Sequence, residues 1–449
     1  MTRFLDRPAE AVANYGLAAY VLCLPLEFTS VYLRQQLNRY VLAIVAAAFL
    51  YLLVTGQRRV AVPRTLSVVL LVLYSAASLI SWLMTRAPGS INAVADLTVY
   101  PVVALLIMNL GLTAAGQRRA WNAFLLSALV VGGMGAVLFL AHLSIWTPNP
   151  LVANRLNITF GDPNITARFL TLGACAAILM FGSRQGITWL CIAATIACAL
   201  VLPLTLSRSG LGLFPLTAVL AVLLSFDRRR AAAIAVAALI VFGGVTAINP
   251  DTRQRAEEAY ATMASAVSGR SVAVGPSATQ PAHNANAADD NRVYLIHAGL
   301  MMFEHRPLTG VGFGGYQHAL LTTYRSYLPA NRTAANLDTL SHASLVTVMA
   351  EQGVVGTLLL VAFFFALALE LWRARRRRDP WSIWVTIPAA LIVPIFVYSN
   401  IEGRLTTEPY LWLSLGLAYA AVAQQREAAS LTKAEPRLDS EKARRPQVA

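Results

Sequence analysis

Residues 120–145 read AWNAFLLSALVVGGMGAVLFLAHLSI and contain no Asp, Glu, Lys or Arg. An apolar run of roughly 18 or more residues is long enough for an α-helix to cross a bilayer. Similar stretches occur on both sides of this one. They predict twelve transmembrane helices, at residues 12–32, 38–55, 65–86, 92–113, 120–145, 165–182, 187–204, 210–226, 230–248, 342–370, 381–399 and 404–424.

The composition of the whole chain agrees with a membrane protein. Of its 449 residues, 57% are hydrophobic and only 13% are charged. A water-soluble globular protein of this length does not normally combine these two values. The sequence therefore predicts an all-α polytopic membrane protein.

Basic residues occur in every second connection between the predicted helices. This is the positive-inside pattern, which places those connections and both termini in the cytoplasm. The formal net charge of +14 is thus explained by membrane topology, and nucleic acid is not an expected partner. The cytoplasmic connections are marked by Arg58, Arg59 and Arg64, by Arg118 and Arg119, by Arg184, by Arg228 to Arg230, and by Arg373 with Arg375 to Arg378.

One outside connection is much longer than the others, and it defines the predicted organisation. Residues 1–248 hold helices 1–9, residues 249–341 form a periplasmic loop domain, residues 342–424 hold helices 10–12, and residues 425–449 form a disordered cytoplasmic tail. Loops of this size usually carry function. The first helix is expected to be an uncleaved anchor, since no signal-peptide pattern precedes it. The four cysteines all fall in apolar segments, so no disulfide or zinc site is expected.

Ionisable residues within the predicted helices gather at one side of the membrane. Such residues are costly in a bilayer and are usually paired or functional. Helix ends also approach water, which explains any single one of them equally well. Their shared bias toward the outer ends is harder to explain by chance. The residues are Glu27, Arg34, Asp96, Arg168, Arg208, Glu402 and Arg404.

The large loop shows a local order of its own. Residues 251–267 and 291–305 have the pattern of helices, with a Ser/Ala/Gly/Asn-rich stretch between them that is expected to be mobile. Residues 307–316, PLTGVGFGGY, predict a glycine-rich turn that leads into a short helix at 317–328. Glycines such as Gly312 and Gly314 let backbone N–H groups approach an anion, although glycines in turns are common.

Two short motifs lie beside this loop at the predicted outer membrane boundary. In LSHASL, Ser341 is the expected N-cap of helix 10 and His342 lies in its first turn, with Gly353 and Gly356 forming a groove on the same face. In LSRSG, residues 206–210, Arg208 and the backbone of a helix start could bind one phosphate. The simpler readings are a histidine bonded to neighbouring backbone and an arginine that reaches lipid headgroups.

These motifs in this order resemble the O-antigen ligase family of lipopolysaccharide assembly. The resemblance rests on His342, Arg208, Arg292, the PLTGVGFGG turn, the Gly161-Asp162-Pro163-Asn164 segment, the helix count and the position of the long loop. It implies a GT-C-type glycosyltransferase of the bacterial inner membrane whose active site faces the periplasm. The reaction would transfer a polysaccharide from undecaprenyl diphosphate to the lipid A-core oligosaccharide, without a metal, nucleotide sugar or other cofactor.

Residue roles follow from the same resemblance. His342 corresponds to the catalytic histidine, and Arg208 and Arg292 correspond to arginines that bind the diphosphate, with Arg306 and Arg325 as substitutes for Arg292. Ser207 is a possible additional contact. An arginine can offset the charge of the leaving diphosphate, and a neutral imidazole can accept the acceptor's proton. Attack opposite the leaving group would invert the anomeric centre.

Other functions fit parts of the pattern. An O-antigen polymerase would use the same donor but is expected to have two large outer loops, and a related oligosaccharide transferase acting on protein remains open. A secondary transporter commonly has twelve helices, but residues 1–225 and 226–449 show no repeat. A scaffolding role would make both motifs accidental. Asp289 and Asp290 are the one adjacent aspartate pair in the loop, but they lie in the stretch expected to be mobile and are weak evidence for magnesium, which needs carboxylates in a fixed octahedral arrangement.

Overall fold

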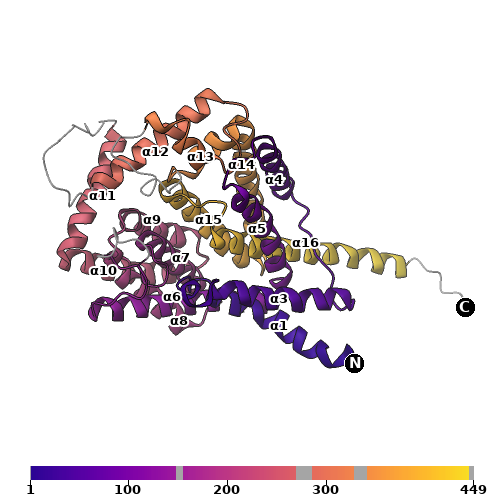
Figure 1. Ribbon diagram of the computed structural model, residues 1–449. Coiled ribbons are helices and arrows are strands. Elements are labelled where there is room, and N and C mark those ends of the chain that lie inside the picture. The colour runs from indigo at the N-terminus through magenta and orange to yellow at the C-terminus, as the bar shows by residue number, and fades with distance from the viewer. Residues whose placement is uncertain (1, 148–154, 269–285, 328–340, 444–449) are drawn as a thin grey trace, which may run out of the picture.

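The computed structural model describes residues 2–147, 155–268, 286–327 and 341–443. Throughout these ranges the regular structure is helical, without a strand (Figure 1). Nine helices of the described chain are long and apolar enough to cross a membrane. They are α3 (Leu37–Val54), α4 (Leu66–Thr85), α5 (Ile91–Leu110), α6 (Ala114–Leu140), α7 (Pro163–Gly182), α8 (Thr188–Val201) with the 3-10 turn η2 (Pro203–Thr205), α10 (Arg228–Ile248), α14 (Ser344–Arg376) and α15 (Ser382–Glu402).

The prediction of twelve spans is therefore confirmed only in part. All twelve predicted stretches are helical, but three do not have the length and hydropathy of a span. Helix α1 (Thr2–Cys23) carries Asp6, Arg7 and Glu10, and a turn separates it from the short α2 (Thr29–Leu33). Helix α9 (Arg208–Leu224) is apolar but shorter than the nine spans. Helix α16 (Pro409–Ala443) is apolar only in its first half, and it continues through 425–443, where the composition predicted disorder.

Helix α7 forms the centre of the protein. Within it, 94% of the apolar window is buried, because α6, α8, α9, α10 and α15 surround it. Small residues allow the close approach: a Cβ added at Gly173 would lie 2.7 Å from the Cβ of Ala128 on α6. A polar residue on α7 is therefore held in a rigid, water-poor environment.

Helix α14 is broken at Gly353, where φ is 62° and ψ is −156°. A kink leaves backbone groups without their helical partners. The loop segment before α13 (Tyr316–Leu321) supplies new ones. The N–H of Val311 donates to Ala350 at 2.8 Å, that of Gly312 donates to Glu351 at 2.9 Å, and Val354 donates to Pro307 at 2.7 Å. The glycine-rich turn is thereby fixed to the first half of α14.

The described part of the large loop is mostly helical. Helices α11 (Pro250–Ser268) and α12 (Asn286–His305) match the predicted helices at 251–267 and 291–305, whereas the predicted helix at 317–328 is divided into α13 and the 3-10 turn η3 (Arg325–Tyr327). A second, smaller core packs α12, α13 and the glycine-rich turn on Ala350 of α14. Residues 269–285 and 328–340 lie outside the described residues.

Candidate functional site

The GDPN segment forms the start of α7. Asp162 is the N-cap, and its Oδ1 accepts hydrogen bonds from the backbone N–H groups of Asn164 at 2.7 Å and Ile165 at 3.2 Å. Pro163 occupies the first helical position, where no N–H is needed. Helix α7 therefore begins at a fixed point, which places Arg168 near the end of the buried bundle.

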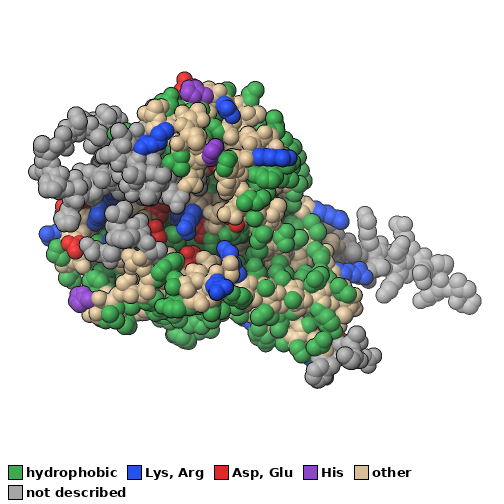
Figure 2. Space-filling view, in the orientation of Figure 1, with side chains coloured by type: hydrophobic (Ala, Val, Ile, Leu, Met, Phe, Trp, Pro, Cys, Tyr) green, Lys and Arg blue, Asp and Glu red, His purple; other side chains and the backbone are tan. Residues whose placement is uncertain are grey.

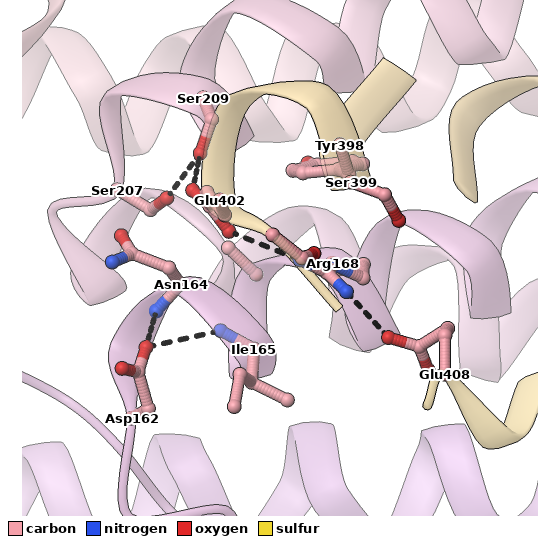
Figure 3. Close-up of polar contacts among 12 residues, drawn as sticks. Asp162, Asn164, Ile165, Arg168, Ser207, Ser209, Tyr398, Ser399, Glu402 and Glu408 are labelled. Carbon is pink, nitrogen blue, oxygen red and sulfur yellow. Dashed lines mark hydrogen bonds and ion pairs between the residues drawn. The ribbon is translucent and has the colours of Figure 1, made fainter. Parts of the chain in front are cut away.

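Arg168 joins three helix ends through its guanidinium group (Figure 3). Its side chain is 1% exposed. Nη1 donates a short hydrogen bond to Oε2 of Glu408, just before α16, while Nη2 lies 3.6 Å from Oε2 of Glu402, the last residue of α15. Nη2 also donates to the carbonyl oxygen of Gly403 at 3.4 Å. Two buried carboxylates thus share one guanidinium, an arrangement that is costly to break.

The SRSG motif forms the start of α9 and faces the same carboxylate. Ser207 is the N-cap, accepting from the N–H of Gly210 at 3.3 Å, and its hydroxyl lies 3.0 Å from that of Ser209. Ser209 Oγ donates to Oε1 of Glu402 (Figure 3). Arg208, the first residue of α9, is half-buried between these two serines. Glu402 therefore connects the turn that carries Arg208 to Arg168.

His342 lies two residues before α14 rather than in its first turn. Its φ is 58°, a left-handed conformation that is uncommon for a residue with a side chain. The expected cap by Ser341 is also wrong: Ala343 occupies the N-cap, and Ser341 Oγ instead accepts from the N–H of Ala343 at 3.2 Å. The left-handed backbone explains the difference, because it interrupts the helix before Ser344.

The start of α14 packs on the end of α15. Ser344 Oγ donates to the carbonyl oxygen of Ser399 at 2.8 Å, and the N–H of Leu345 donates to Oδ1 of Asn400 at 3.0 Å. A Cβ added at Gly403 would lie 3.8 Å from the Cα of His342. The backbone of His342 therefore lies beside the Glu402–Gly403 turn, to which the Arg208 turn is also bound.

Charged side chains are grouped on this part of the surface. Figure 2 shows Arg, Asp and Glu side chains in a recess in the middle of the face toward the viewer, while hydrophobic side chains dominate the lower surface. Near this group, burial raises the pKa of Glu27 to about 7, and the carboxylates of Glu408 and Asp162 add to the shift. The guanidinium groups of Arg404 and Arg168 oppose it.

The loop arginines have different positions. Arg292 lies in α12, but its side chain is not among those that the structure describes. Arg306 is exposed in the turn after α12, and Arg325 is half-buried in η3. The structure thus brings the SRSG turn and the backbone of His342 to the Glu402–Gly403 turn.

The glycine-rich turn is occupied by protein rather than open to a ligand. Gly312 and Gly314 have φ values of 103° and 71°, and added Cβ atoms would lie 2.0 Å from Thr85 Oγ1 and 2.8 Å from the Cβ of Ser90. The buried carboxylate of Glu351 accepts the N–H groups of Gly314 and Tyr316, the latter at 3.1 Å. Gly312 and Gly314 therefore serve close packing in this structure.

The expected groove beside Gly353 and Gly356 is filled as well. A Cβ added at Gly353 would lie 2.5 Å from the carbonyl group of Leu308, and one at Gly356 would lie 2.3 Å from the Cβ of Gln352. A groove on one face requires a continuous helix, and α14 is kinked at Gly353, so the predicted groove is absent from this face.

A pocket of about 410 Å³ lies behind the SRSG turn. Its walls come from the end of α6, residues 155–158, the link between η2 and α9, and the junction of α10 with α11. The polar lining includes His142, Ser144, Arg155, Asn157, Asn249 and Asp251. Among the described residues, no group of three or more His, Cys, Asp or Glu side chains is placed to hold a metal ion.

Fold and site together define an all-helical polytopic membrane protein with a charged site where several helix ends meet. A family model described as O-antigen ligase matches residues 193–361, so this part of the chain is similar to that family. Its members carry out ligase- or polymerase-type transfer of lipid-linked glycans. No curated protein matches the chain.

The family match contains Arg208, Arg292 and His342 but ends before Glu402. From the sequence, Arg168 and Glu402 were predicted only to be ionisable residues at helix ends, and neither was assigned to the site. Glu408 and Arg155 were not predicted as site residues. The one available signal was the Arg168 charge in an apolar stretch, which requires a buried partner.

Proposed function

We propose that this protein is an O-antigen ligase that transfers a polysaccharide from undecaprenyl diphosphate to the lipid A-core oligosaccharide. Support comes from one observation above all: the turn carrying Arg208 and the backbone of His342 both meet the Glu402–Gly403 turn. A cation and a titratable imidazole at one place are the two groups that this transfer needs. We further propose a GT-C-type fold and a site facing the periplasm.

Arg208 acts on the leaving group in this proposal. Cleavage of the glycosyl–phosphate bond places negative charge on the diphosphate, and a guanidinium fork can bind phosphate oxygens in pairs. Arg208 lies at the N-terminus of α9, where the helix dipole also favours an anion. Arg292, or Arg306 or Arg325 in its place, would bind the diphosphate from the loop side. This charge compensation removes the need for a metal ion.

His342 acts on the acceptor. The lipid A-core hydroxyl attacks the anomeric carbon, the bond to the diphosphate oxygen breaks, and the hydroxyl proton passes to the neutral imidazole. Attack from the face opposite the diphosphate inverts the anomeric centre. The left-handed backbone at His342 costs energy, and such conformations are retained when the surrounding contacts fix them at a working site.

Complementation of a strain that lacks its O-antigen ligase tests the proposal. His342→Ala should reduce O-antigen on lipid A-core by at least about 100-fold, within the range for loss of an acid–base group. Arg208→Ala should reduce it by a similar factor, within the range for loss of one group that stabilises the developing negative charge. His318→Ala and Arg86→Ala are matched controls, because both side chains are exposed outside the site. Wild-type attachment by the first two variants at equal expression would contradict the proposed roles.

The product distinguishes a ligase from a polymerase. A ligase joins glycan to lipid A-core, whereas a polymerase lengthens the lipid-linked glycan itself. Complementation of a polymerase-deficient strain instead of the ligase-deficient one would replace our proposal by the polymerase.

A further inference from the structure

Arg155 lies between α6 and α7 and binds the backbone just before the SRSG motif. Its Nε donates to the carbonyl oxygen of Thr205 at 3.1 Å, and its Nη2 donates to that of Leu206 at 3.1 Å. Nη2 also donates to Oδ1 of Asn164 at 3.0 Å. Asn164 belongs to the GDPN segment, so Arg155 ties the start of α7 to the link between η2 and α9.

This link contains a residue in an unfavourable conformation. Leu206 has φ 54° and ψ 29°, in the left-handed region. That conformation is unfavourable for a residue with a side chain, whereas glycine adopts it freely. Such strain persists only where surrounding contacts hold the backbone. The hydrogen bonds at this link include the two from Arg155 to the carbonyl oxygens of Thr205 and Leu206, the bond from the N–H of Leu206 to the carbonyl oxygen of Pro203 at 3.0 Å, and the bond from the N–H of Ser207 to Thr205 Oγ1 at 3.3 Å.

The left-handed turn at Leu206 lies two residues before Arg208, the first residue of α9. It joins η2 to α9, so the direction of the first residues of α9 depends on the backbone at Leu206. A guanidinium group suits this task because its planar fork can bond two successive carbonyls and an amide at once. A lysine ammonium lacks that geometry.

We propose that Arg155 is a positioning residue that holds the left-handed turn at Leu206 and thereby orients Arg208 toward the diphosphate. The proposal rests on the function proposed above, since it assumes that Arg208 binds the donor. Arg155 acts through the backbone of Thr205 and Leu206 and does not itself bind the donor.

The test compares Arg155→Ala with the double variant Arg155→Ala/Leu206→Gly in the purified full-length protein. The substrates are undecaprenyl diphosphate-linked glycan and lipid A-core. Misplacement of a substrate-binding group by about 1 Å can cost about 100-fold, and we expect a loss of this order for Arg155→Ala. Glycine adopts the left-handed turn without strain, so the double variant should recover at least about tenfold relative to Arg155→Ala. Arg155→Lys should behave like Arg155→Ala.

Two further variants complete the design. Leu206→Gly alone is the reference for the double variant, and Arg86→Ala is the control for loss of an exposed arginine. Thermal unfolding in detergent is measured for every variant, so that lost activity is compared only among folded proteins. In addition, Arg155→Ala/Arg208→Ala should be no less active than Arg208→Ala, because Arg155 acts through Arg208.

The outcomes separate this inference from the proposed function. A folded double variant as inactive as Arg155→Ala would mean that Arg155 contacts the substrate directly, and wild-type activity of Arg155→Ala would mean that the turn needs no support. Either result would overturn the positioning role while Arg208→Ala stays inactive. Full activity of Arg208→Ala would instead refute the proposed function itself.

Discussion

Arg168 carries a buried positive charge between the carboxylates of Glu402 and Glu408. Neither carboxylate could have been paired with it from the sequence, since both lie more than 230 positions away and Glu408 stands in a turn between two apolar helices. The sequence could show only that an arginine in an apolar stretch needs a partner. The identity of that partner depends on how α7, α15 and α16 pack.

Replacement of Arg168 alone should therefore be more harmful than replacement of the whole group. Arg168→Met leaves two carboxylates close together without their cation, and loss of one partner from a buried ion pair costs about 3–5 kcal/mol. The triple variant Arg168→Met/Glu402→Gln/Glu408→Gln should unfold at a higher temperature than Arg168→Met. Thermal unfolding in detergent measures both. A triple variant less stable than the single one would show that the ionic group itself stabilises the bundle.

Glu27 lies between α1 and α2 and gives the stability of the protein a dependence on pH. Burial raises the pKa of its carboxyl from 4.5 to about 7 in the folded protein. The folded state thus prefers the protonated form, and this stabilising contribution is present below about pH 4.5 and is lost as the pH rises through 7. In Glu27→Gln the side chain has nearly the same shape and is uncharged at every pH.

We therefore expect Glu27→Gln to gain stability relative to the wild type as the pH rises from 4.5 to 7, and the gain should be constant at higher pH. Unfolding temperatures at pH 5 and pH 8 measure the change. Glu10→Gln serves as control because that side chain is exposed on α1. A difference in unfolding temperature between Glu27→Gln and the wild type that is the same at both pH values would contradict a raised pKa of Glu27 in the folded protein.

At the scale of elements, α14 shows how much of a helix the hydrophobic pattern can predict. The pattern predicted one helix over residues 342–370, and the helix from Ser344 is present. The break at Gly353 was not predicted, because the apolar pattern continues beyond it and the residues on both sides suit a helix equally well. The break becomes necessary only when Pro307 and Leu308 pack against it, and that contact joins segments far apart in the sequence.

The glycines of this contact should not tolerate a side chain. Gly353→Ala places a Cβ 2.5 Å from the Leu308 carbonyl at a φ of +62°, and strain and overpacking should each cost about 1–3 kcal/mol. The loop should detach from α14, and limited proteolysis should then cut near residues 306–315. Gly243→Ala on α10 is the control, since no atom lies within 4 Å of its added Cβ. Equal protease resistance of Gly353→Ala and Gly243→Ala would show that the contact between the loop and α14 does not depend on Gly353.

At the scale of the whole molecule, alternating arginines and apolar stretches predicted where the polar site lies. The residues that meet at the candidate site stand at the starts of α7, α9, α14 and α16 and at the end of α15, all of which the arginine pattern assigned to the outer side. The start of α1 and the end of α16 lie away from α11, α12 and α13 (Figure 1). The sequence thus predicted the region of the site but not its contacts, which depend on tertiary packing.

Cysteine accessibility can test this sidedness in living cells. Thr309→Cys lies exposed in the glycine-rich turn, and Gln57→Cys lies exposed in an arginine-bearing connection. Each is placed in a Cys23→Ser background, because the other three native cysteines are buried. If the arginine-rich connections face the cytoplasm, a membrane-impermeant maleimide should label Thr309→Cys in intact spheroplasts and label Gln57→Cys only after permeabilisation. The reverse pattern would place Arg208 and His342 in the cytoplasm and would exclude a periplasmic transfer reaction.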